Sequence, residues 1–257
     1  MACFVPFNTT NMEISLLVFR PTVVEVDDVV ESLKHFSLCT EGHGCLHSAI
    51  LRSIHGNMII WYGAWMKRSD EKKDSLSAAF SSMLTNVSSM AILIDQSFFE
   101  AYAGESREGC QAAKIFTGDI VSLNSTTLST DDMNKNYFSY ACLAIFRTRF
   151  LKMEGATAGV CLKSQTMSRV VGLFVWKSLH HCYSYILNTD YRETILPYLE
   201  GHSLDIKYDI FRVAYVSSNN AADIQFFSSS RLWQNDVEGK GGCPVTQDFE
   251  RKGQDIK

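Results

Sequence analysis

Four cysteine and histidine side chains lie close together near the N-terminal end of the chain and have the chemistry to bind a metal ion. They are Cys39, His43, Cys45 and His47, and His35 lies one helical turn before the first of them. Thiolate and imidazole groups are the ligands that zinc prefers, and four of them complete a structural site. The alternating spacing of His43, Cys45 and His47 predicts that these three side chains share one face of an extended strand.

The compactness of this cluster argues against zinc. Structural zinc sites combine two ligand pairs separated by an intervening segment, and the sequence has no Cys-x-x-Cys pair. A chain of 257 residues also buries enough apolar surface to fold without a metal. We therefore predict no bound metal and no cofactor, and retain Cys39, His43, Cys45 and His47 only as candidates. The same cluster supports an alternative reading, an enzyme that uses a thiol–imidazole pair in the loop at residues 35–47.

A second set of residues with a chemical use is aromatic. Trp61, Trp65, Phe174 and Trp176 fall in two apolar runs that are typical of strands. Aromatic side chains on strands usually pack in a core, but they also line cavities that hold small apolar ligands. The sequence leaves both readings open, and these four residues are our candidates for a ligand pocket.

Motifs of several functional classes are absent. The sequence has no Gly-x-Gly-x-x-Gly fingerprint, no phosphate-binding loop ending in Gly-Lys-Ser/Thr, no His-Glu-x-x-His and no Gly-x-Ser-x-Gly. The net charge is −4 and basic residues cluster at most in pairs, so we expect no nucleic-acid partner. No apolar run approaches the roughly 20 residues that a membrane-spanning helix needs.

Secondary structure must position these candidates, and the apolar spacing predicts the element order β-α-β-β-α-β twice. The first set has strands at 14–19, 45–53, 58–66 and 90–94 and helices at 23–36 and 69–86. The second set has strands at 113–123, 156–162, 170–176 and 206–216 and helices at 130–153 and 178–199. This order is the one found in ferredoxin-like folds.

The predicted fold class is therefore α+β, with two ferredoxin-like βαββαβ halves whose antiparallel sheets carry helices on one face. Residue identity between the halves is poor, so two readings remain: an internal duplication, or one irregular α+β domain. We divide the chain into an N-terminal half at residues 1–108 and a C-terminal half at residues 109–227. Residues 228–257 have no apolar periodicity and are predicted to be a disordered tail.

The cysteines and the N-terminus bear on the compartment. The first residues lack the basic and apolar regions of a signal peptide, so the eight cysteines are expected to be reduced thiols. We therefore expect a cytoplasmic or nuclear protein.

Three stretches resemble a known family. They are Phe-Val-Pro-Phe-Asn through Ile-Ser-Leu-Leu-Val-Phe-Arg-Pro at residues 4–21, Ile-His-Gly-Asn-Met-Ile-Ile-Trp-Tyr-Gly-Ala-Trp-Met at 54–66, and Met-Glu-Gly-Ala-Thr-Ala-Gly-Val-Cys-Leu at 153–162. Together they look like a plant-specific family of uncharacterised proteins with a domain of unknown function, over about residues 1–227. The resemblance implies a plant origin and no assigned activity, so it assigns no catalytic residue.

These observations lead to a functional prediction of a non-enzymatic binding or regulatory module. Its partner would be another protein or a small apolar ligand, and the sequence does not indicate an oligomeric state. The alternative is the enzyme that uses the cluster at residues 35–47. A cleft in which two or more of those side chains converge would favour the enzyme, and an apolar cavity without titratable groups would favour the binding module.

Overall fold

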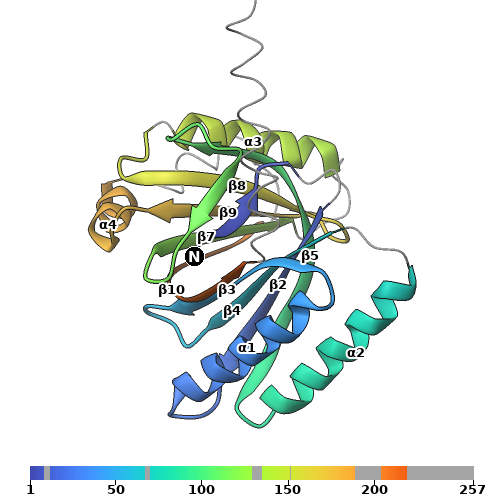
Figure 1. Cartoon of the computed structure of the whole chain (residues 1–257). Coiled ribbons are helices and arrows are strands. Elements are labelled where there is room, and N and C mark those ends of the chain that lie inside the picture. The colour runs from blue at the N-terminus through green and yellow to red at the C-terminus, as the bar shows by residue number, and fades with distance from the viewer. Residues whose placement is uncertain (9–11, 67–69, 129–134, 151, 189–203, 219–257) are drawn as a thin grey trace, which may run out of the picture.

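The computed structural model describes residues 1–8, 12–66, 70–128, 135–150, 152–188 and 204–218. Within these segments the chain forms ten strands and four helices. Figure 1 shows the strands gathered in a barrel, with the helices lying against its outer surface. The predicted tail at residues 228–257 lies outside the described residues, and the predicted division at residue 108 stays a prediction.

The element order agrees with the predicted one over most of the chain. The first part contains β1 (Cys3–Pro6), β2 (Met12–Pro21), α1 (Val26–Glu41), β3 (Cys45–Ser53), β4 (Ile59–Met66), α2 (Asp70–Val87) and β5 (Ala91–Ser106). The second part contains β6 (Ala112–Ile115), β7 (Ile120–Leu128), α3 (Lys135–Phe150), β8 (Ala156–Ser164), β9 (Arg169–Trp176), α4 (Leu179–Asn188) and β10 (Leu204–Ser218). Apart from β1 and β6, the order is β-α-β-β-α-β twice.

One predicted strand is two strands in the structure. The segment predicted as a single strand at residues 113–123 is interrupted by a turn at Gly118, whose φ of 97° belongs to the left-handed region that favours glycine. The turn separates β6 from β7, and β6 pairs with β1 in a small antiparallel sheet. The first part of the predicted helix at 178–199 is observed as α4, and the part beyond residue 188 lies outside the described segments.

The prediction of an α+β fold with antiparallel sheets is confirmed, but the strands do not form two separate sheets. Eight strands close into one barrel in the order β10-β3-β4-β2-β5-β8-β9-β7, and all neighbours are antiparallel. The long strands β5 and β10 pair on both sides and join the first four-stranded set to the second. Barrel closure leaves no strand edge unpaired, which removes a template for aggregation. Strand periodicity reports which face is buried and carries no information about which edges meet.

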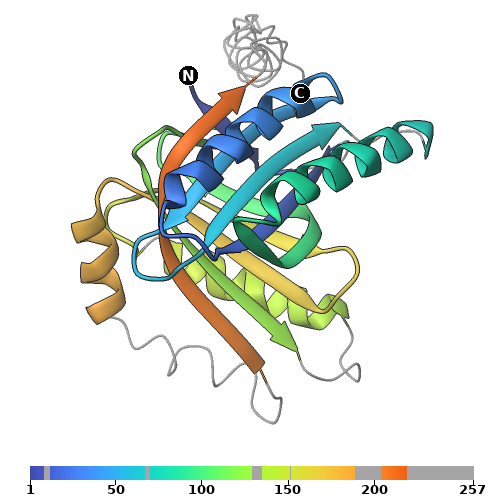
Figure 2. The same cartoon turned by 90° about the horizontal axis from the view of Figure 1, so that it is seen from below.

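The barrel strands β4 and β9 are buried on both faces. Inward side chains form one apolar core inside the barrel, to which β4 contributes Ile60 and Tyr62. The outward side chains of β4, including Trp61 and Trp65, pack under α1 and α2. A third core lies between the strands of the second set and helices α3 and α4. Figure 2 shows α1 and α2 side by side over the strands. Burial on both faces explains why β4 and β9 are almost continuous apolar runs without alternation.

The β1–β6 sheet packs against one end of the barrel. Val5, Ala113 and Ile115 belong to the interior core, and the Tyr62 hydroxyl donates a hydrogen bond of 3.1 Å to the Phe4 carbonyl oxygen. Burial, the largest effect, raises the pKa of Tyr62 well above its usual value of 10.0. This end of the barrel is therefore filled by protein side chains.

Candidate functional site

A cavity of about 710 Å³ lies at the opposite end of the barrel from the β1–β6 sheet. Strands β2, β4, β5, β7, β9 and β10 all contribute side chains to it, so it is an opening into the barrel interior. Its volume lies within the range usual for sites that bind small molecules. The apolar part of its wall is formed by Leu16, Val18, Met58, Ile60, Leu123, Val171 and Phe211.

Charged side chains line the same cavity. They are Arg20, Asp95, Arg169, Lys207 and Asp209. Each stands near the beginning or end of a strand, where the barrel interior meets solvent. The cavity therefore combines an apolar wall with a mouth that carries three cations and two carboxylates.

Arg169 is held in the mouth by contacts that cross the barrel. Its Nη1 lies 2.5 Å from Asp95 Oδ2 and 3.2 Å from Ser97 Oγ, both on β5, and its Nε donates to Ser125 Oγ on β7 at 2.8 Å. The guanidinium carbon lies 5.6 Å from the centre of the Phe99 ring, at cation–π distance. Ser97 also donates to Asp95 Oδ1 at 2.8 Å, so the carboxylate is held in turn. These contacts fix the guanidinium plane.

Two side chains in the cavity have polar atoms that make no hydrogen bond within the described segments. The Nη2 group of Arg169 has no hydrogen-bond partner among the described residues, although the side chain is only 16% exposed. Asp209 accepts a hydrogen bond from the Ile210 backbone N–H through Oδ1 at 2.8 Å, while its buried Oδ2 has no partner within the described segments. Buried polar atoms are nearly always hydrogen-bonded, so the buried Asp209 Oδ2 is an exception that indicates a functional use.

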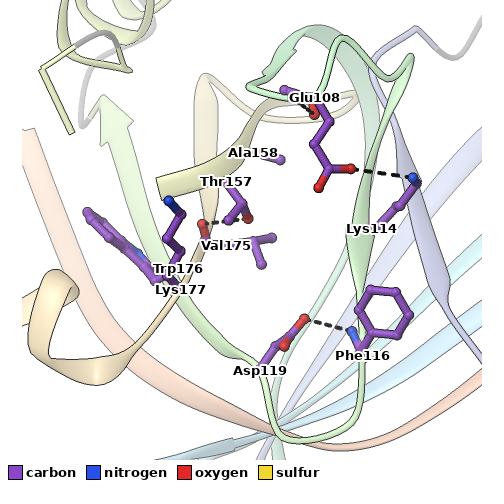
Figure 3. A pocket seen from close by; sticks show the side chains of 10 residues that line it. Glu108, Lys114, Phe116, Asp119, Thr157, Ala158, Val175, Trp176 and Lys177 are labelled. Carbon is purple, nitrogen blue, oxygen red and sulfur yellow. Dashed lines mark hydrogen bonds and ion pairs between the residues drawn. The ribbon is translucent and has the colours of Figure 1, made fainter. Parts of the chain in front are cut away.

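A smaller pocket of about 400 Å³ lies at the other end of the barrel, between the β6–β7 turn and the ends of β5, β8 and β9. Figure 3 shows polar contacts in its wall, among them those of Lys114 with Glu108 and of Asp119 with Phe116. Lys114 Nζ lies 3.5 Å from Glu108 Oε2, and Asp119 Oδ2 accepts a hydrogen bond of 2.8 Å from the Phe116 backbone N–H. Three of its charged side chains are therefore engaged, Lys114 and Glu108 with each other and Asp119 with the backbone.

Two side chains of the smaller pocket have shifted pKa values. Burial raises the pKa of Asp119 above its usual value, and the hydrogen bond from Phe116 offsets part of this effect. Burial is also the largest effect on Lys114 and lowers its pKa, but the nearby Cys110 and Glu108 together outweigh it and leave the pKa raised. The smaller pocket has four apolar lining residues, so we take the 710 Å³ cavity, whose apolar wall is more extensive, as the candidate functional site.

The predicted cysteine and histidine cluster does not converge. Cys39 is exposed on α1, and His43 Nδ1 lies 3.0 Å from the Cys39 carbonyl oxygen beyond the helix end. Cys45 packs in the core under α1 and α2, whereas His47 lies inside the barrel, 5.3 Å from the ring centre of Phe4. The predicted common face is wrong because the β3–β4 register shifts between Cys45 and His47, which turns the two side chains to opposite faces.

Metal-binding geometry is likewise not found in the part of the chain that the structure describes. There, no group of three or more His, Cys, Asp or Glu side chains is arranged to hold a metal ion. The absence of bound metal from the protein remains a prediction, which elemental analysis would test.

The four aromatic candidates lie mainly in the cores under the helices. Trp61 donates to Ser37 Oγ at 2.9 Å under α1, and Trp65 is buried beside it. Phe174 stacks on Phe146 of α3 with ring centres 5.6 Å apart. Trp176 is buried in the third core and also lines the smaller pocket. None of the four lines the 710 Å³ cavity within the described segments.

Sequence reasoning missed the residues that do line the cavity. Arg169 opens the apolar run of β9, and Asp95 follows the apolar residues at the beginning of β5. A charged residue at the edge of an apolar strand run is a usable signal, because it places the charge where the strand leaves the core. Only the barrel closure brings these two residues together, because β8 separates their strands.

Comparison with known proteins gives a family match over part of the chain. A family model described as a domain of unknown function (DUF7392) matches residues 97–211, from within β5 into β10. This agrees with the resemblance to a domain of unknown function, while the plant origin stays a prediction. No curated protein matches the sequence. None of the helices in the described segments combines the length and apolarity that a membrane crossing requires.

Solved structures share this fold. An anthrone oxidase-like protein superposes with a TM-score of 0.62 at 15% identity, covering 84% of this chain and 97% of its own. A protein described as a monooxygenase from Fusobacterium nucleatum gives a TM-score of 0.59 at 11% identity, covering 82% of this chain and 96% of its own. Another, from Lactobacillus acidophilus, gives 0.52 at 11% identity, covering 81% and 96%.

These similarities contradict the predicted function. The prediction was a non-enzymatic binding or regulatory module, but the similar structures are described as monooxygenases and as an oxidase-like protein. A binding module was expected to have an apolar cavity without titratable groups. The barrel cavity instead carries five charged side chains. The alternative enzyme based on residues 35–47 fails as well, because Cys45 and His47 lie on opposite faces of β3.

Proposed function

We propose that this chain is an enzyme that binds a small, largely apolar organic molecule in the barrel cavity and oxidises it with dioxygen. The observation that carries this proposal is the cavity itself. It is about 710 Å³, it opens into the interior of the barrel, and its apolar wall meets fixed charged groups at the mouth. An apolar pocket with a few convergent polar groups is the usual form of a small-molecule active site.

The similar structures support the oxidative part of the proposal. One is described as anthrone oxidase-like and two as monooxygenases, and these names indicate oxygen chemistry. At 11–15% identity the likeness establishes the fold alone. That this chain carries out an oxidation is our proposal.

The simplest reaction of this class needs only dioxygen as oxidant. A CH₂ group of the substrate becomes C=O, so that one oxygen atom enters the product and the other leaves as water with both hydrogens. Such a reaction begins with loss of a proton from the substrate, which requires a base. Asp209 and Asp95 are the carboxylates in the cavity, and Asp95 is engaged by Arg169. We therefore assign the proton-accepting role to Asp209.

Oxygen consumption tests the proposal. The purified full-length protein is mixed with small aromatic substrates that have an acidic CH₂ group, anthrone among them, and oxygen uptake is followed with an electrode. We expect uptake above the uncatalysed rate, with a loss of roughly a hundredfold or more in Asp209→Asn, the range for removal of a general base. The control is Arg212→Gln, an exposed position on the outer face of β10.

Two further results would contradict the proposal. Leu123→Trp fills the apolar wall of the cavity, so undiminished turnover in this variant would place the reaction elsewhere. Tight binding without oxygen uptake, over a panel that includes CH₂, phenol and aldehyde substrates, would remove the oxidative part.

We also infer that the two βαββαβ segments are an internal duplication, divided near residue 108. Their elements follow the same order, and each four-stranded set has the same neighbour order, β5-β2-β4-β3 and β10-β7-β9-β8. This support comes from the order of the strands alone, because the two four-stranded sets form one barrel and not two separate sheets.

A further inference from the structure

We propose that the molecule bound in the barrel cavity carries an anionic oxygen group, such as a carboxylate, which Arg169 and Arg20 bind at the mouth. This inference rests on the proposed function, because it takes the same cavity as the substrate site. It adds the substrate class, an aromatic or aliphatic acid whose apolar body lies against the inner strands.

The first support is the way Arg169 is held. Ser125 engages Nε, and Asp95 and Ser97 both engage Nη1, so the contacts come from strands β7 and β5 on two sides of β9. A guanidinium group has five N–H donors, and these partners leave the two on Nη2. The planar fork is therefore fixed in orientation with one edge unused, which is the arrangement needed to bind an anionic oxygen group without further ordering.

The second support is the low exposure of the Arg169 side chain. It is 16% exposed, and Phe99 lies against the guanidinium at 5.6 Å. A charge-assisted hydrogen bond is stronger in a position partly shielded from water, so a ligand oxygen at Nη2 is favoured. Since Arg169 lines the cavity, that oxygen comes from a molecule inside it.

The third support is the charge balance at the mouth. The titratable groups that line the cavity are Arg20, Asp95, Arg169, Lys207, Tyr208 and Asp209. Arg169 neutralises Asp95 through their contact of 2.5 Å, and Arg20 forms no ion pair within the described segments. Arg20 therefore presents a positive charge that a ligand with one negative charge can neutralise.

Displacement of a neutral fluorescent probe tests the inference in the full-length protein. N-phenyl-1-naphthylamine, which has no charge, reports occupation of the apolar cavity. It is displaced with 2-naphthoate or with 2-naphthamide, which have nearly the same shape and differ in charge. We expect naphthoate to bind about tenfold more tightly, the effect of a hydrogen bond to a charged group.

Variants assign that preference to the mouth. Arg20→Gln and Arg169→Gln should each reduce the preference for naphthoate several-fold and leave naphthamide binding unchanged. Asp95→Asn should strengthen naphthoate binding, because it removes the charge that competes for Arg169, and a gain of this kind cannot come from misfolding. Arg212→Gln removes one positive charge from the outer face of the barrel and should change neither ligand.

The outcomes separate this inference from the proposed function. If the neutral probe binds and Leu123→Trp weakens it, but naphthoate and naphthamide compete equally, the cavity is a ligand site and the anionic class is wrong. An equal effect of Arg212→Gln and Arg20→Gln also overturns the inference, since the attraction would then be a general effect of charge. If the probe does not bind, or Leu123→Trp leaves its binding unchanged, the cavity site and this inference both fail.

Discussion

The indole Nε1 of Trp176 donates a hydrogen bond of 2.9 Å to Ser122 Oγ across the pair β7–β9. Trp65 and Ser15 make the corresponding bond of 2.8 Å across β2–β4. In both pairs the serine lies two residues beyond the residue that faces the tryptophan in the register. The two four-stranded sets of the barrel therefore satisfy a buried indole N–H in the same way, and an unsatisfied one would cost free energy.

Trp176→Phe should lower the free energy of unfolding by about 2 kcal/mol, because it leaves the buried Ser122 hydroxyl without its donor and removes part of a buried ring. Urea denaturation measures this change. The double variant Trp176→Phe, Ser122→Ala should recover part of the loss, since no unpaired hydroxyl remains. A double variant whose loss equals the sum of the single losses would show that the bond contributes nothing.

Gly155→Ala should destabilise the protein by about 3 kcal/mol, through backbone strain and a steric clash. Gly155 has a φ of 84°, and a Cβ there would lie 2.4 Å from the His181 ring. The matched control is Gly109→Ala, where φ is 69° and no atom lies within 4 Å of the added Cβ. Only the left-handed backbone is penalised there, so about 1 kcal/mol is expected. Equal losses at the two positions would rule out the clash with His181.

Asp119→Asn should increase stability at pH 7 and have less effect as the pH falls. Burial raises the pKa of Asp119 in the folded state above its usual value of 3.8. A raised pKa means that the folded state binds the proton more tightly. The contribution of Asp119 to stability is therefore fully present below pH 3.8 and is lost as the pH rises through the folded pKa.

Asparagine removes that loss at neutral pH and can still accept the hydrogen bond from the Phe116 N–H. Urea midpoints for both proteins at pH 7 and near pH 3.5 measure the difference. A stability gain that is the same at both pH values would contradict the assignment to the ionisation of Asp119.

Cys182 should resist alkylation in the folded protein, whereas Cys39 reacts. Burial raises the pKa of the Cys182 thiol to about 11, and its contact with the Tyr208 hydroxyl at 3.8 Å offsets part of the effect. Because the thiolate is the reactive form, little of it is present at pH 8. Mass spectrometry after iodoacetamide treatment should find Cys39 modified and Cys182 modified only after unfolding in urea. Equal labelling rates in the native protein would contradict the buried position.

Two fragments, residues 1–108 and 109–257, should assemble when they are produced together. The division falls beside Gly109 in an exposed turn, and the fragments would meet through β5–β8, β10–β3 and β1–β6. Copurification of an untagged fragment with a tagged one measures assembly. Three antiparallel contacts with a shared apolar core favour the complex. Fragments that stay separate although each is soluble would count against the division near residue 108.

The sequence by itself determined the secondary structure and the class of the fold. Apolar content located strands such as 45–53 and 156–162 within a few residues of β3 and β8, because nearly all side chains of these strands are buried. It also gave the repeated β-α-β-β-α-β order. The apolar runs of β4 and β9 contained the aromatic side chains that fill the cores under the helices.

The tertiary structure alone decided the barrel and the site. The β3–β4 register shift separates Cys45 from His47, and a strand pattern does not reveal an extra residue in the ladder. Arg169 meets Asp95 across β8 only because two four-stranded sets close on each other through their edges. Edge pairing depends on backbone groups that every residue shares, so residue types do not specify which edges meet. The charged mouth of the cavity is therefore a property of the closed barrel, to which each strand contributes one or a few of the side chains.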